Sequence, residues 1–113
     1  MANTFLNAKS DLTTTNLTTV YTAPSATTAV IKSILVSEDA GSGTTIDVTL
    51  VDASGTIFSL FKAKAVGSNT TVELLTQPLV LKESEALKAQ AADANELHVV
   101  ASILEVKPRE VVT

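Results

Sequence analysis

The stretch that decides the fold class is Thr44-Thr45-Ile46-Asp47-Val48-Thr49-Leu50-Val51. Aliphatic side chains stand at every second position from Ile46 to Leu50, with polar ones between them. Successive side chains of a β-strand point to opposite faces, so this alternation predicts a strand with one buried and one solvated face. The turn-forming residues 52–55 follow at once, and with residues 56–63 they predict a β-hairpin.

The same pattern extends outward from this stretch. Turn residues recur roughly every ten positions, a spacing typical of a many-stranded sandwich or barrel. Thr, Val and Ile make up about a third of the chain, and their β-branched side chains suit a pleated surface. About eight strands are predicted: 17–22, 28–36, 44–51, 56–63, 70–75, 79–81, 83–92 and 96–106. The sequence therefore predicts an all-β fold, an antiparallel β-sandwich of the jelly-roll type.

One of these segments, 83–92, fits two kinds of element. Its composition is that of a helix, and Ser84 has the right chemistry to cap one. It also alternates, with Leu87, Ala89 and Ala91 at every second position. Because its neighbours are short and closely spaced strands, we favour a strand.

The 113 residues contain no internal repeat or linker, so residues 1–113 are expected to form a single β-sandwich domain. Residues 1–11 are expected to be an extended N-terminal arm, in which a further strand could begin around Phe5. Residues 107–113 are expected to be a C-terminal tail. No apolar run approaches the ~20 residues that span a bilayer, and the start of the chain does not resemble a secretory signal.

Composition argues against several classes of function. The net charge is −4, and the eight basic residues are scattered singly, so neither direct nucleic-acid binding nor a polybasic membrane patch is expected. Cysteine is absent and His98 is the sole histidine, which leaves too few soft ligands for a zinc, copper or non-haem iron site. We therefore expect no enzyme and no cofactor. A calcium site at Glu38, Asp39 and the 41–43 turn is chemically possible, but no Asp-x-Asp spacing supports it.

Some predicted strands are apolar on both faces. Strict alternation in 28–36 places Val30 with Ile34 and Val36 on one face, and Ile31 with Leu35 on the other. A sandwich needs only one apolar face per strand, so the second is expected to face a partner, unless loops cover it as in a closed barrel. The residues expected at a protein interface come from the arm, from strand 56–63 and from the tail: Phe5, Leu6, Ile57, Phe61, Val111 and Val112.

Two parts of the sequence resemble small virion structural proteins of tailed bacteriophages. The first is Val20-Tyr21-Thr22-Ala23-Pro24 followed by residues 29–36. The second is residues 81–92 followed by 97–106, although Glu83-Ser84-Glu85 stands where that family usually has a Gly-Asp turn. The resemblance implies a jelly-roll sandwich, a homo-oligomer that is often a trimer, and a place on the virion.

Within that family the leading expectation is a capsid decoration, or cement, protein that binds major capsid subunits. A neck, tail, baseplate or fibre component is the alternative. A carbohydrate- or receptor-binding module is a second alternative. Sugar binding usually needs an aromatic platform, whereas this chain has no Trp, one Tyr and three Phe.

Overall fold

The structure is a computed structural model that describes residues 3–107, and this part of the chain contains nine strands. Their bounds are β1 Asn3–Leu12, β2 Thr18–Thr22, β3 Thr28–Glu38, β4 Thr44–Val51, β5 Ile57–Val66, β6 Thr71–Glu73, β7 Leu79–Leu81, β8 Ala86–Ala91 and β9 Leu97–Val106. Within residues 3–107, no helix is long and apolar enough to cross a membrane.

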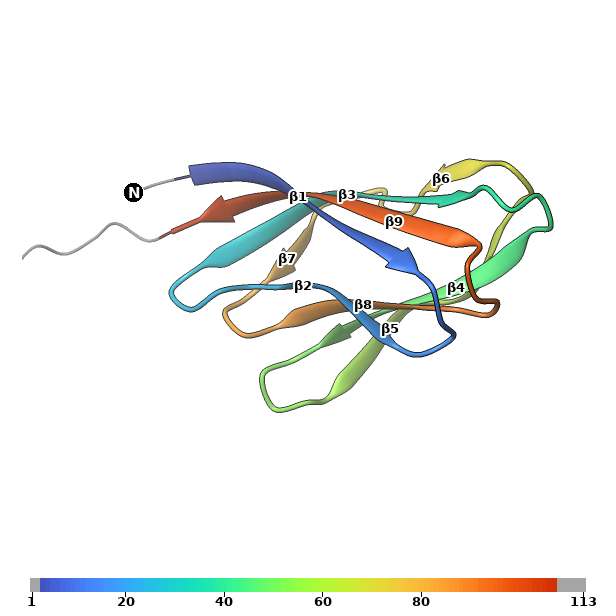
Figure 1. The fold of residues 1–113 in the computed structure, drawn as a ribbon. Coiled ribbons are helices and arrows are strands. Elements are labelled where there is room, and N and C mark those ends of the chain that lie inside the picture. Colours follow the sequence, from blue (N-terminus) through green and yellow to red (C-terminus); the bar gives the residue numbers. More distant parts are fainter. Residues whose placement is uncertain (1–2, 108–113) are drawn as a thin grey trace, which may run out of the picture.

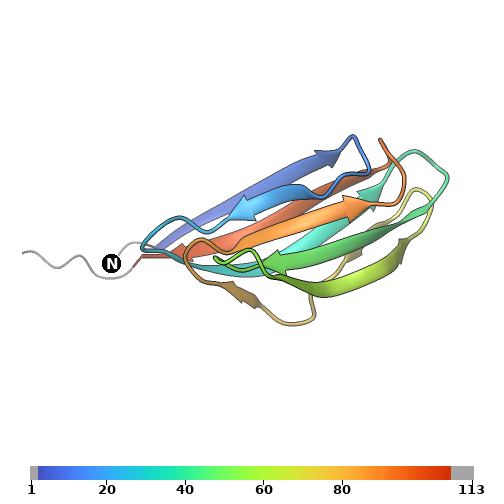
Figure 2. The ribbon, with the colours of Figure 1, turned by 90° about the horizontal axis from the view of Figure 1, so that it is seen from below.

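The strands form two antiparallel sheets that face each other (Figure 1). One sheet has the order β1-β9-β3-β6, and β7 also pairs with β3, farther along that strand from β6. The other has the order β2-β8-β4-β5. Successive strands lie in different sheets, except that β4 and β5 share one sheet and β6 and β7 share the other. This is the double Greek-key arrangement of a jelly roll. Figure 2 shows the two layers from below, with their strands running along the molecule.

The core lies between the sheets and consists of the inward side chains of both. The largest fully buried apolar residues include Ile31, Ile46, Leu81, Leu87 and Ile103. Each stands between neighbours that are more exposed, as the period of two along a strand requires. The alternation in Thr44–Val51 is therefore the pattern of a strand that lies against the core, and its predicted bounds match β4.

The expected all-β sandwich is confirmed, and each of the eight predicted segments contains a strand. Segment 83–92 contains strand β8, Ala86–Ala91, and no helix. The ninth strand corrects the expectation of an N-terminal arm over residues 1–11. Asn3–Leu12 pairs with β9 along its whole length, from Asn3 opposite Val106 to Leu12 opposite Leu97.

The predicted faces of β3 were wrong, because a β-bulge at Lys32 interrupts the alternation. The register with β9 shifts between Ile31 and Ser33, so Ile31 and Ile34 both point inward. The carboxylate of Glu73 stabilises the bulge: it accepts hydrogen bonds from the N–H of Ile34 at 2.8 Å and from Ser33 Oγ. Burial raises the pKa of Glu73, but these hydrogen bonds outweigh that effect and the pKa is lowered.

Candidate interaction surface

The outer face of the five-stranded sheet carries a row of apolar side chains across four strands. Phe5 on β1 lies opposite Leu104 on β9, Leu104 opposite Val30 on β3, and Val30 opposite Val80 on β7. Directly paired residues share a face of the sheet, so the four side chains form one line, called here the apolar row. Phe5 is 77% exposed and Val80 52%, whereas Leu104 and Val30 are half-buried.

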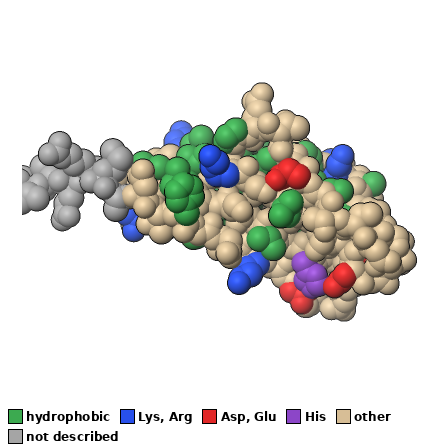
Figure 3. All heavy atoms as spheres, turned by 90° about the horizontal axis from the view of Figure 1, so that it is seen from above, with side chains coloured by type: hydrophobic (Ala, Val, Ile, Leu, Met, Phe, Trp, Pro, Cys, Tyr) green, Lys and Arg blue, Asp and Glu red, His purple; other side chains and the backbone are tan. Residues whose placement is uncertain are grey.

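A second apolar pair and a groove extend this surface. Leu35, which is 40% exposed, lies opposite Val100 on the same outer face. Between the row and this pair is a groove of about 470 Å³, lined by Phe5, Leu6, Asn7, Lys32, Ser102 and Ile103. Figure 3 views this side of the molecule and shows apolar side chains gathered toward the end from which the grey residues extend. An apolar patch that crosses four strands of one face is the usual mark of an interaction site.

The opposite end of the same face is charged. His98 Nε2 lies 3.3 Å from Asp11 Oδ1, and His98 Nδ1 lies 3.5 Å from Asp39 Oδ2. In Figure 3 the histidine stands between red carboxylates. All three side chains are solvent-accessible. Among residues 3–107 no group of three or more His, Cys, Asp and Glu residues is placed to hold a metal ion. This charged cluster therefore bounds the apolar surface at this end of the face.

The buried carboxylate of Glu38 holds the β3–β4 loop and does not form a cation site. It accepts hydrogen bonds from the backbone N–H groups of Gly41 at 3.0 Å, Ser42 at 3.1 Å, Gly43 at 2.8 Å and Asn69 at 3.1 Å. The bond from Asn69 has the largest effect on the pKa of Glu38, and with the bonds from Gly41 and Gly43 it outweighs burial, so the pKa is lowered to about 2. The backbone N–H groups of the turn, and not its carbonyl groups, point toward the carboxylate. Carbonyl and carboxylate oxygens therefore do not converge there as a calcium site would need.

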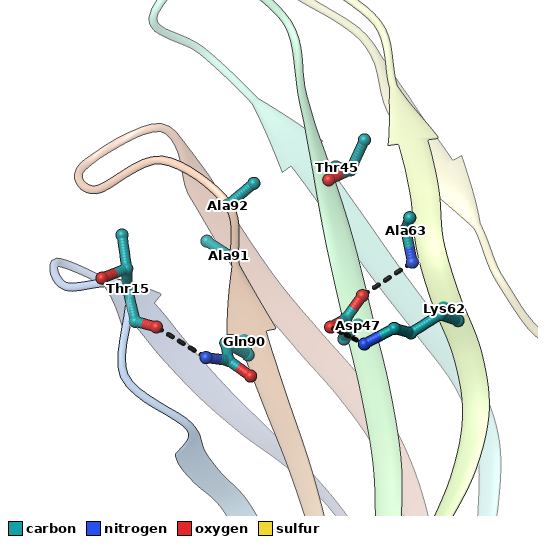
Figure 4. Close-up of a pocket in the computed structure, with 8 residues that line it drawn as sticks. All are labelled: Thr15, Thr45, Asp47, Lys62, Ala63, Gln90, Ala91 and Ala92. Atoms are coloured by element: carbon teal, nitrogen blue, oxygen red, sulfur yellow. Dashed lines mark hydrogen bonds and ion pairs between the residues drawn. The ribbon is translucent and has the colours of Figure 1, made fainter.

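The outer face of the four-stranded sheet is polar by comparison. It contains a groove of about 460 Å³, lined by Thr15, Thr45, Asp47, Lys62, Ala63, Gln90, Ala91 and Ala92 (Figure 4). Asp47 accepts hydrogen bonds from the N–H of Ala63 at 2.6 Å and from Lys62 Nζ at 3.4 Å. Gln90 Nε2 donates to the carbonyl of Thr15 at 2.9 Å. The main polar groups of the groove thus bind one another, and no aromatic ring lines it.

Strand β5 forms the free edge of that sheet and is exposed along most of its length. Ile57 is 57% exposed, Phe58 51% and Leu60 36%. Phe61 is half-buried and packs against the core, because it lies opposite Val48. The register with β4 shifts twice, on either side of Val48, so β5 is bulged at Leu60 and again at Lys62–Ala63.

The interface residues expected from the sequence fall in three different places. Phe5 lies in the apolar row, whereas Leu6, its neighbour, points inward and packs against the core. Ile57 and Phe61 lie on β5, at the edge of the other sheet. Val111 and Val112 lie outside the described residues. The other members of the row were not among the residues expected at an interface, because strand register brings them together and no local motif marks them.

No protein-family model matches the chain, and no curated protein matches it. A search of solved structures does find similar folds. A chain in the acid-stable capsid structure of Helicobacter pylori bacteriophage KHP30 is similar with a TM-score of 0.56 at 12% identity, over 94% of this chain and 89% of that one. The chain shares the fold of that phage capsid component. At this identity the likeness shows the fold alone.

Two further similarities are weaker. The virus-like particle of the extra small virus of the prawn Macrobrachium rosenbergii gives a TM-score of 0.48 at 11% identity, over 96% of this chain and 80% of that one. A family 22 carbohydrate-binding module of Clostridium thermocellum Xyn10B gives 0.41 at 22% identity, over 80% and 60%. Both TM-scores lie below 0.5, so these two likenesses add nothing to the assignment of the fold.

Proposed function

We propose that the chain is a structural protein of a phage virion and that it decorates the capsid. In this proposal it binds major capsid subunits through the outer face of the five-stranded sheet. The observation that supports it best is the apolar row, which lies on a fold shared with a component of a phage capsid structure. The two chains are also similar in length, because the alignment covers most of each.

The row has the properties that docking onto a shell requires. It runs perpendicular to the strands, from edge strand β1 to edge strand β7, so a partner reaches it without any strand moving. Phe5 is its most exposed member and an aromatic side chain, the kind that contributes most to a protein interface. A polar line lies beside the row on one side, formed by Asn7, Ser33 and Ser102 across the sheet.

Decoration would stabilise a shell by mass action. A protein that binds the assembled lattice and not its dissociated subunits shifts the equilibrium toward the lattice by an amount set by its concentration and affinity. Such a function requires a binding surface and no catalytic group. We accordingly propose no catalytic activity and no cofactor.

The finer expectations from the resemblance are part of this proposal. They are a trimeric homo-oligomer, synthesis in the host cytoplasm and final location in the virion, with a neck, tail, baseplate or fibre position as the alternative. Copy number separates capsid decoration from the tail positions, because a shell holds many more equivalent sites than a tail.

The test is co-sedimentation of the purified protein with capsids of the virus that encodes it, made without this protein. We expect saturable binding at many copies per capsid and a raised temperature of capsid disruption. Binding at a few copies per particle would favour the tail alternative. Absence of binding to any part of the particle would refute the proposal.

A further inference from the structure

We infer that the groove beside the apolar row receives an acidic side chain of a major capsid subunit, which pairs with Lys32. This inference rests on the proposed docking of the same face and adds the chemistry that the shell presents there. The feature that carries it is the make-up of the groove of about 470 Å³ between the row and the Leu35–Val100 pair.

The lining of the groove contains a cation and hydrogen-bond donors but no anion. Lys32, Asn7 and Ser102 supply its polar groups, and its other lining residues are apolar. An ammonium, a side-chain amide and a hydroxyl all donate hydrogen bonds, and an ionised carboxylate only accepts them. A carboxylate on a short methylene stem therefore matches both the polar and the apolar parts of this lining.

The β-bulge on β3 sets the position of Lys32. Ile31 lies opposite Ile103 and Ser33 opposite Ser102, so Lys32 is the extra residue, with no directly paired residue on β9. Bulges commonly re-aim a side chain next to a functional site. Here the exposed Lys32 reaches the groove from β3, while Asn7 lines it from β1 on the other side of β9.

The carboxylates on this face of the described chain are engaged elsewhere. No ion pair within residues 3–107 involves Lys32. Glu73 accepts the hydrogen bonds that stabilise the bulge, and Asp11 and Asp39 lie beside His98 at the far end of the face. Figure 3 shows blue side chains beside the green ones near the grey residues, with the red carboxylates farther from that end. The Lys32 ammonium is therefore available to a carboxylate from a partner.

Docking on the apolar row makes such a carboxylate necessary. Phe5 belongs both to the row and to the lining of the groove, so a partner that covers its ring also displaces water from the groove. An ammonium that loses its water without gaining a counter-charge is strongly disfavoured, whereas a carboxylate compensates for the lost water. A capsid subunit that docks here therefore presents an Asp or Glu beside the apolar side chains that contact the row.

The experiment uses capsids made without this protein, saturated with the whole chain and treated with a carbodiimide. This reagent joins an amine to a contacting carboxylate as an amide, with loss of water. Peptide mass spectrometry should find Lys32 joined to an Asp or Glu of the major capsid subunit. Lys32→Arg keeps the positive charge but cannot form this amide, so the cross-link should disappear while the chain still co-sediments with capsids.

Capsid affinity provides a second measurement. Lys32→Gln should raise the dissociation constant about threefold, because an ion pair at the rim of an interface contributes little. Lys32→Glu places like charges together and should raise it more than about tenfold. Added salt should weaken wild-type binding more than it weakens binding of Lys32→Gln. The matched control is Lys64→Glu, at an exposed position on β5 of the other sheet, which should bind as the wild type does.

Lys32→Glu with wild-type affinity would overturn the inference, as would a cross-link from Lys32 to a carboxylate of its own chain or of a second copy. In either case a loss of affinity in Phe5→Thr would leave the proposed docking face standing. Wild-type protein that binds no capsid would refute the proposed function, and this inference with it. Circular dichroism checks that each variant stays folded.

Discussion

Replacing Phe5 by Thr separates a docking residue from a folding residue. Phe5 is 77% exposed, so its ring contributes little to the core, and Thr keeps a β-branched side chain in β1. An aromatic side chain buries about 150–250 Å², and three quarters of the middle of that range is about 150 Å². At ~25 cal/mol per Å² this area corresponds to at most ~4 kcal/mol. We expect about half of that, since Thr retains a methyl group and burial in a partner is incomplete.

A loss of ~2 kcal/mol corresponds to roughly thirtyfold weaker binding to the capsid. The free energy of unfolding should change by no more than about 0.5 kcal/mol, as for other exposed positions. Both quantities are measurable, by capsid co-sedimentation and by urea unfolding. Leu17→Thr is the matched control, because Leu17 is also exposed but lies in the β1–β2 loop, outside the apolar row. Unchanged capsid affinity in Phe5→Thr, with the fold intact, would refute the assignment of the docking face.

Three further predictions concern the fold. Leu87→Ala should lower the free energy of unfolding by about 3 kcal/mol, because Leu87 is fully buried between the sheets; urea unfolding measures this, and a loss below 1 kcal/mol would contradict the packing. Glu38 has a folded pKa of about 2, below its ordinary value of 4.5, so its contribution to stability is present above about pH 4.5 and disappears as the pH falls toward 2. The free energy of unfolding should therefore fall less steeply between pH 4.5 and pH 2 in Glu38→Gln than in wild type. Parallel plots of that free energy against pH for the two proteins would count against the Glu38 hydrogen bonds. Gly43→Ala should cost about 1 kcal/mol or more, since Gly43 has a φ of +72°, and an unchanged melting temperature would contradict that backbone conformation.

The hydrophobic pattern predicted a strand well where its ends are set by turn residues next to it in the sequence. The bounds of β4 and β7 match the sequence prediction, because turn residues lie close to the ends of each. Strand β1 was expected only as a possible strand within an arm, because its inward residues include Ala8 and Ser10, which give a weak hydrophobic signal. Its pairing with β9, which at Asn3 and Val106 joins residues more than a hundred positions apart, makes it a strand.

The faces of β3 show a second limit. The bulge at Lys32 depends on the carboxylate of Glu73, which is 39 positions from the Ile34 N–H that it binds. Strict alternation therefore assigned Val30 to the same face as Ile34, whereas the structure places it in the apolar row. The row itself combines residues from four strands, so it emerges only once register is known. The sequence indicated that individual strands had a second apolar face, but not that residues of four strands combine into one row.

The most direct test of the central claim is a reconstruction of the native virion with the protein in place. We predict many copies on the capsid surface, with Phe5 and Val80 against major capsid subunits and the four-stranded sheet turned away from the shell. Density for the protein only in the tail, or contact with the shell through the four-stranded sheet, would contradict the assignment.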